Sequence, residues 1–249
     1  MSGHSKWATI KRKKAATDAA RGKIFTKYIK EITIAARSGG GDPEANPRLR
    51  TAILGAKSVN MPVSNIERAI KRGTGEIEGA AYEEVSYEGY GAGGVALLID
   101  CATDNRNRTA GEVRHILSKY HGNMAEAGAV SYLFKPRGVI VVDRGAIDED
   151  TLMEIVLDAG ADDVTSHGEV WEVLTSQSAF EAVRQALAAR TVPVQTAETT
   201  KLASLLVPVT EQHAESILKL VDALEDNDDV QKVYVNFEVP DAVLARLAR

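Results

Sequence analysis

The sequence predicts an α+β protein: an N-terminal three-helix bundle plus two α/β (ferredoxin-like) domains, the third inserted into a discontinuous second. Two observations carry this prediction. Residues 1–79 place apolar residues at helical spacing, with glycine-rich breaks between the stretches. After them, short apolar runs typical of strands alternate with amphipathic helical stretches. The expected domains are 1–79, a discontinuous domain of 80–136 and 205–249, and 137–204 inserted within it.

Three helices are expected in the N-terminal part. The first follows an apolar stripe formed by Ile24, Phe25, Tyr28, Ile32 and Ala36. It should end in the glycine run at 38–41, where positive φ is accessible. Asn46 is expected to cap the second helix, with Pro47 in its first position. Ser64 and Glu67 have the spacing of a capping box and are expected to start the third.

The second domain is expected to be built from two separated segments. Its first elements are strands at 85–88 and 95–102, a helix from Thr109 and a strand at 130–134. Compared with the inserted domain of residues 137–204, this set of elements lacks one helix and one strand. A helix at 211–224 and a strand at 230–237 would complete it, which makes the domain discontinuous.

The inserted domain has a recognisable order of elements. They are a strand at 139–142, a helix at 149–159, strands at 163–166 and 169–174, a helix at 178–189 and a strand at 192–200. The order β-α-β-β-α-β is the ferredoxin-like arrangement.

Composition places the chain among soluble cytoplasmic proteins. Its 249 residues are 44% hydrophobic, enough for sizeable cores. No apolar run approaches the roughly 18 residues of a membrane span, and no signal-peptide h-region follows the N-terminal charges. Cys101 is the single cysteine, which fits a reducing compartment, and its apolar neighbours predict a buried thiol.

Motifs of catalysis are absent from the sequence. Residues 89–94 match G-x-G-x-x-G, but an apolar strand follows instead of the helix that dinucleotide binding requires, so a glycine-rich hairpin connection is expected. There is no P-loop, no G-x-S-x-G elbow and no His at metal-ligand spacing. We therefore expect no enzyme activity, no cofactor, no metal and no small-molecule substrate.

Charge is distributed unevenly along the chain. The net charge is −5, but residues 1–37 hold ten Lys and Arg against two acidic residues, so they carry +8 and the remainder −13. A solvated helix face, the alternative interpretation, is usually stabilised by opposite charges at i,i+4 spacing, which are nearly absent here. Unpaired basic residues neutralise phosphates and release counterions, and an aromatic side chain among them can stack on a base. The predicted nucleic-acid-binding residues are Lys6, Trp7, Lys11, Arg12, Lys13, Lys14, Arg21, Lys23, Lys27 and Lys30.

Residues 104–109, DNRNRT, place two arginines and two amides immediately before a helix. Arg106 and Arg108 are predicted as a secondary phosphate contact, because a helix N-terminus attracts anions and arginine binds phosphate in a bidentate manner. The alternative is a loop whose polar side chains bind its own backbone. The acidic run at 225–229 is expected to be a solvated loop.

Several blocks of the chain resemble the YebC/PmpR family of probable transcriptional regulators. They are GHSKWATIKRKKAATDAARGKIFTKYIKEI, GGGDPEANPRLR, YEGYGAGG, DNRNRT and AVSYLFKPRGV, in this order over essentially the whole chain. The resemblance implies three domains, the third inserted in the second, and a cytoplasmic, non-enzymatic role. Bacterial members are described as DNA-binding regulators of transcription. Related members, including a mitochondrial translational activator, act at the ribosome, so the alternative partner is ribosomal RNA, with relief of stalling at proline-rich stretches as the proposed role.

Overall fold

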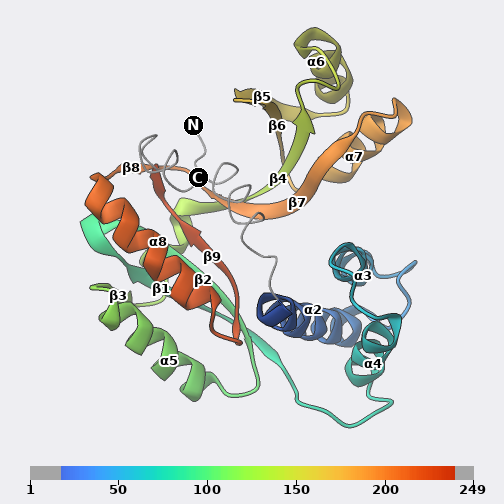
Figure 1. Cartoon of the computed structure of the whole chain (residues 1–249). Coiled ribbons are helices and arrows are strands. Elements are labelled where there is room, and N and C mark those ends of the chain that lie inside the picture. Colours follow the sequence, from blue (N-terminus) through green and yellow to red (C-terminus); the bar gives the residue numbers. More distant parts are fainter. Residues whose placement is uncertain (1–17, 239–249) are drawn as a thin grey trace. The chain divides into compact units, whose positions relative to one another are not determined.

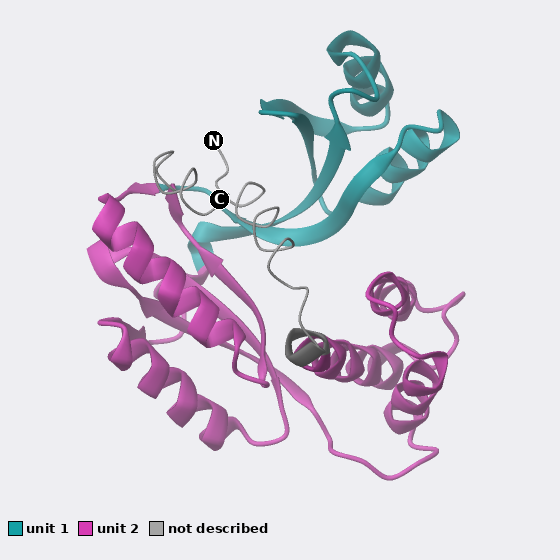
Figure 2. Cartoon of the chain, viewed as in Figure 1, with its two compact units in different colours: residues 1–8, 132–206 teal, residues 9–131, 207–249 magenta. Residues whose placement is uncertain are grey.

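The computed structural model describes residues 18–238 (Figure 1). The described residues divide into two compact units, 132–206 on the one hand and 18–131 with 207–238 on the other (Figure 2). They contain a helical bundle and two mixed α/β domains, one of them inserted into the other, as the sequence predicts. Within this range, none of the helices combines the length and apolar character that a membrane span requires.

Helices α2 (Asp18–Gly39), α3 (Pro47–Ser58) and α4 (Val63–Thr74) form the bundle. Its core residues include Ile32, Leu49, Ala56, Ile66 and Ala69. The predicted cap of α3 is confirmed, because the Asn46 side chain accepts a hydrogen bond from the backbone N–H of Leu49 at 3.1 Å.

The capping box predicted for α4 is wrong. The helix begins one residue before Ser64, directly after Pro62, and no side chain caps it. Pro62 has a φ of −57° and a ψ of 135°, so the fixed proline ring sets the extended entry into the helix. Ser64 is therefore a helical residue with its side chain exposed.

The discontinuous domain is built on a four-stranded antiparallel sheet in the order β3-β1-β2-β9. Its strands are β1 (Glu83–Tyr90), β2 (Ala96–Thr103), β3 (Asn123–Ala125) and β9 (Val230–Val235). Helices α5 (Arg106–Lys119) and α8 (Glu211–Glu225) pack against each other and on this sheet, with Leu97, Leu117 and Leu220 fully buried (Figure 1). As predicted, α8 and β9 complete the domain from a distant part of the chain.

Two local expectations in this domain need correction, and one holds. Helix α5 begins at Arg106 and not at Thr109, because Asn105 is its cap. The strand expected at 130–134 is a short 3-10 turn, Ser131–Leu133. The glycine-rich segment 89–94 is the predicted hairpin connection, with a 3-10 turn, Ala92–Gly94, between β1 and β2.

Glu88 explains why the chain just before the second of these turns, Ser131–Leu133, does not form a strand. Its carboxylate accepts hydrogen bonds from the backbone N–H groups of Gly128, Val130 and Ser131 at 2.7, 2.5 and 2.9 Å. These groups are thereby withdrawn from strand pairing. Burial raises the pKa of Glu88, but the three backbone hydrogen bonds outweigh burial, so the pKa is lowered overall.

The inserted domain has the predicted ferredoxin-like order. Its elements are β4 (Phe134–Asp143), α6 (Glu149–Asp158), β5 (Ala161–His167), β6 (Val170–Thr175), α7 (Phe180–Ala189) and β7 (Val194–Ala203). The strands pair antiparallel in the order β5-β6-β4-β7, over a core that includes Ile140, Leu152, Val173 and Leu187.

The two sheets have the same spatial plan. In the discontinuous domain, β2 occupies the position of β4, β3 that of β5 and β9 that of β7. The position of β6 is filled by β1, which comes first in the chain. The inserted domain thus lies in sequence between β3 and α8, where a strand equivalent to β6 would otherwise occur. A further short parallel pair, β8 (Val207–Pro208) with β10 (Phe237–Glu238), follows the insertion.

Candidate nucleic-acid interface

Helix α2 presents three lysines on one face. Lys23, Lys27 and Lys30 follow each other at spacings of four and three residues, so they are neighbours on the helix surface. This face meets the acidic loop 225–229 that follows α8. Lys23 Nζ lies 2.9 Å from Asp226 Oδ1, and Lys27 Nζ donates to the backbone carbonyl of Glu225 at 2.9 Å. The acidic loop expected to be solvated is therefore the partner of this basic face.

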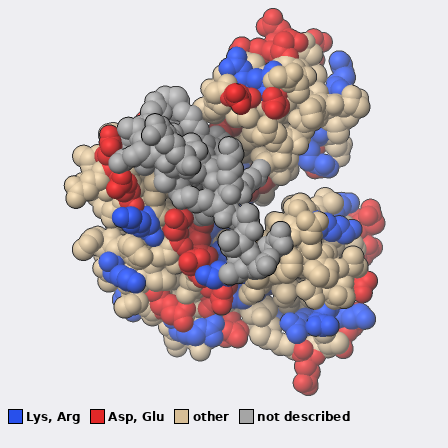
Figure 3. Space-filling model, viewed as in Figure 1, with Lys and Arg blue, Asp and Glu red and all other residues tan. Residues whose placement is uncertain are grey.

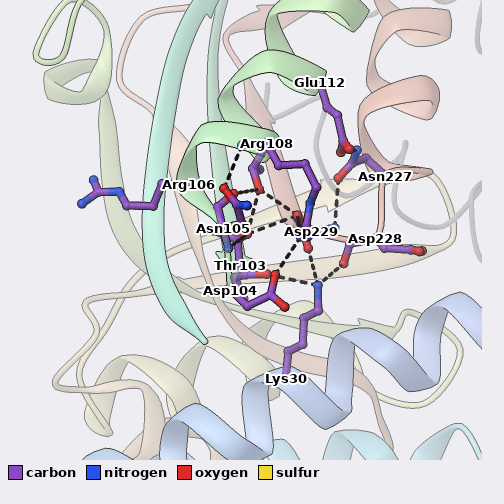
Figure 4. Close-up of polar contacts among 12 residues, drawn as sticks. Lys30, Thr103, Asp104, Asn105, Arg106, Arg108, Glu112, Asn227, Asp228 and Asp229 are labelled. Carbon is purple, nitrogen blue, oxygen red and sulfur yellow. Dashed lines mark hydrogen bonds and ion pairs between the residues drawn. The ribbon is translucent and has the colours of Figure 1, made fainter. Parts of the chain in front are cut away.

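Lys30 is enclosed at the centre of this contact (Figure 4). Its Nζ lies 2.6 Å from Asp229 Oδ1 and donates to the backbone carbonyls of Asp228 at 2.8 Å and Ala102 at 3.2 Å. The three donors of an ammonium group are all used. Only 6% of the Lys30 side chain and 7% of the Asp229 side chain are exposed. The fold already uses the charge of Lys30, so this pairing counts against the predicted contact between Lys30 and phosphate, which stays untested.

Asp229 connects α2 to the start of α5. Its second oxygen, Oδ2, accepts from Arg108 Nη2 and from the Thr109 hydroxyl at 2.7 Å each, and from the Thr103 hydroxyl at 3.2 Å. Burial raises the pKa of this carboxyl, but hydrogen bonds from Arg108, Lys30 and Thr109 outweigh it and lower the pKa to about 2. Asp229 is a charged, fully partnered group inside the fold.

The polar side chains of residues 104–109 bind mostly to other groups of the protein. Asn105 caps α5 by accepting from the backbone N–H of Arg108 at 3.1 Å. Arg108 also binds Asp104 at 2.9 Å, and its hydrogen bonds to Asp229 and Asp104 raise its pKa. Only Arg106 stays open to a ligand, since its side chain is 60% exposed and its ion pair with Glu83 is 3.7 Å long. The alternative interpretation of this loop thus describes Asn105, whereas Arg108 binds the carboxylates of Asp104 and Asp229.

Three exposed cations of the bundle have side chains without a partner in the described range. Lys57 lies in the last turn of α3. Arg68 and Lys71 lie three residues apart on α4, opposite its buried residues Ile66 and Ala69. All three are exposed, and none of their side chains forms an ion pair or hydrogen bond with another residue of the described range. Figure 3 shows Lys and Arg side chains gathered at the lower edge of the bundle. The helical period of α4 was the signal that could have revealed these residues.

Other bundle cations are paired instead. Arg48 reaches Glu31 at 2.8 Å and Glu84 at 2.7 Å, and Arg50 lies 3.7 Å from Glu44. The pairing separates the cations of the bundle into those used by the fold and those left for a partner.

Six of the predicted residues lie outside the described range: Lys6, Trp7, Lys11, Arg12, Lys13 and Lys14. Arg21 belongs to α2, but its side chain is likewise outside the description. Their assignment stays a prediction.

Metal and thiol chemistry find no support among the described residues. In residues 18–238, no three His, Cys, Asp or Glu side chains gather in a way that could hold a metal ion. Cys101 is buried as predicted, and burial, together with the charges of Asp229 and Asp100, raises the pKa of its thiol to about 12. The thiol therefore stays protonated and is no nucleophile at neutral pH.

Comparison with known proteins gives matches over nearly the whole chain. Residues 5–76 match the family described as TACO1/YebC protein N-terminal domain, and residues 82–237 match TACO1/YebC second and third domain. A probable transcriptional regulatory protein of Syntrophobacter fumaroxidans is 57% identical over 100% of both chains. One of Geobacter sulfurreducens is 56% identical over 99% of this chain and 100% of the other. The crystal structure of a conserved hypothetical protein from Aquifex aeolicus has 48% identity and a TM-score of 0.81, covering 91% of this chain and 93% of that one.

Proposed function

The chain belongs to the TACO1/YebC family, and we propose that this YebC-type regulator binds DNA through its N-terminal helical part to control transcription. The names of its relatives support a regulatory role. The observation that carries the binding proposal is the set of exposed, unpaired cations on α3 and α4.

Lys57, Arg68 and Lys71 gain no stabilisation from the fold. Arg68 and Lys71 are neighbours on one helix face and repel each other when no anion is present. A polyanion removes this repulsion, and each phosphate that it places near a cation releases a condensed counterion. Binding by this route fixes the position of the protein but reads no base sequence.

The basic segment before α2 extends the proposed surface. It contributes Lys6, Lys11, Arg12, Lys13 and Lys14, with Trp7 available to stack on a base. Arg21 and Arg106 are included in this surface. Lys23, Lys27, Lys30 and Arg108 are omitted, because the acidic run 225–229 already binds them. The net charge of −13 beyond residue 37 repels phosphate, so the protein approaches its target with the helical end first.

The proposed role requires no catalysis or cofactor and is cytoplasmic. The regulatory names of the relatives support the first point. A chain with one buried cysteine suits a reducing compartment, which supports the second.

Crosslinking in cells followed by sequencing of the bound nucleic acid tests this proposal. The wild-type chain should recover promoter DNA, and a variant with Lys57, Arg68 and Lys71 changed to Ala should recover clearly less. An Arg48→Ala variant is the matched control, because Glu31 and Glu84 already hold this arginine. Recovery of ribosomal RNA in place of promoter DNA would overturn the proposal in favour of a translation factor.

A further inference from the structure

Helices α2 and α4 touch backbone to backbone at Gly73. A Cβ atom there would lie 2.5 Å from the carbonyl oxygen of Thr33 and 2.6 Å from Ala36 Cβ, so only glycine fits without a shift. This crossing brings together the last turns of the two helices. Arg37 of α2 and Arg72 of α4 line one open cavity of about 540 Å³. Its wall is completed by Gly73, Gly75, Ile77, Glu78 and Gly79.

Arg72, which lines this cavity, has an unsatisfied hydrogen-bond donor. Its Nε is buried and has no hydrogen-bond partner, and its guanidinium forms no ion pair with another described residue. A guanidinium carries five N–H donors in a fixed plane, and a buried donor without a partner is destabilising. The side chain is held in place by the chain segment beside it, since a Cβ at Gly79 would lie 3.0 Å from Arg72 Cδ.

Arg37 supplies a second positive charge to the same cavity. Its Nη1 donates to the backbone carbonyl of Tyr82 at 3.1 Å, a contact that leaves its charge without a counter-charge. Glu78 also lines the cavity, yet within residues 18–238 no ion pair joins it to Arg37 or Arg72. Two cations and one carboxylate leave the cavity with an excess of positive charge.

We propose that this cavity binds a backbone phosphate of the nucleic acid, an inference that rests on the proposed function. Planar guanidinium groups match the geometry of phosphate oxygens and bind them in a bidentate manner. Gly75 belongs to the wall, and a Cβ atom there would meet nothing within 4 Å, so a phosphate can approach closely at this point. The cavity is open, which suits a group carried on a continuous polymer better than an enclosed small molecule.

Salt-dependent binding of the full-length chain to a mixed-sequence DNA duplex tests the inference. Arg72→Ala should bind about tenfold more weakly and reduce the slope of log K against log salt by about one unit. Arg72→Lys should keep the slope, because the charge remains, but should not restore full affinity, because the bidentate fork is lost. Arg114→Ala, which removes an exposed arginine of α5, is the control and should leave the slope unchanged.

The outcomes separate this inference from the proposed function. A wild-type chain with no salt-dependent binding refutes the proposed function and the site together. A wild-type chain that binds with a steep slope, while Arg72→Ala binds with the same slope, refutes the site alone.

A direct observation covers the case in which Arg72→Ala unfolds. The Nε–H resonance of Arg72 in the wild-type protein should shift when the duplex is added, and the absence of a shift would refute the site. Inorganic phosphate is titrated in parallel. A shift with inorganic phosphate but none with DNA would refute the assignment to a nucleic acid.

Discussion

Replacing Lys30 by methionine is expected to destabilise the contact between α2 and the discontinuous domain by about 3 kcal/mol. Methionine has nearly the same length and can fill the space of the lysine stem. It leaves Asp229 Oδ1 and the carbonyls of Ala102 and Asp228 without their common donor. Removing one partner of a buried ion pair typically costs about 3–5 kcal/mol. We expect the lower end, because Arg108 still forms an ion pair with Asp229 and Thr109 still donates a hydrogen bond to it.

Hydrogen–deuterium exchange is the suitable assay, because the chain has more than one compact unit and two-state unfolding cannot be assumed. Protected amides of α2 should exchange roughly a hundredfold faster in Lys30→Met than in the wild type. Lys23→Met is the matched control, since the Lys23 and Asp226 side chains are 43% and 74% exposed and such pairs contribute less than about 1 kcal/mol. Equal exchange in the two variants would refute the reasoning that Lys30 is a structural cation.

Three further predictions concern pH, packing and chain cleavage. The pKa of Asp229 is about 2, below its unfolded value, so its stabilisation of about 2 kcal/mol is present above pH of about 4 and lost as pH falls towards 2. Acid titration of unfolding should show this loss, and Asp229→Asn should lack it. In thermal unfolding, Gly73→Ala should destabilise the protein by about 1–3 kcal/mol, because the new Cβ pushes α2 and α4 apart. Gly111→Ala has open space at its Cβ and should be neutral or stabilising. Equal effects of the two variants would refute the close packing of α2 and α4 at Gly73. Limited proteolysis should cut first within residues 75–81, which are exposed and outside helices and strands, and early cutting within 139–200 would contradict this.

Local patterns predicted most of the fold. The inserted domain follows from periodicity alone, because each strand and helix buries residues at its own period. The cap at Asn46 followed from the Asn-Pro pair. The start of α5 was misplaced because Asn105 and Thr109 are both good caps. Asp229 decides which of them caps α5, because it accepts a hydrogen bond from the Thr109 hydroxyl. Asp229 lies 120 positions further along the sequence.

The candidate site was less accessible to sequence reasoning. The spacing of Lys23, Lys27 and Lys30 shows that they share a helix face, but the partner of Lys30 lies 199 positions further along. The burial of a lysine depends on tertiary contacts, so the local sequence pattern does not predict it. Arg68 and Lys71 were missed because their sequence segment does not stand out by its charge. Their segment includes Glu67, so its charge is not unusual until pairing in the fold shows which cations are free.

The central claim is that cations left unpaired by the fold of the bundle bind nucleic acid. It is tested most directly by the salt dependence of DNA binding in two matched variants of the full-length chain. Changing Lys57, Arg68 and Lys71 to Ala should flatten the slope of log K against log salt by roughly two to three units. Changing Arg48 to Ala should alter it by less than about one unit, because Glu31 and Glu84 already neutralise this arginine. Equal slopes in the first variant and the wild type would contradict the account.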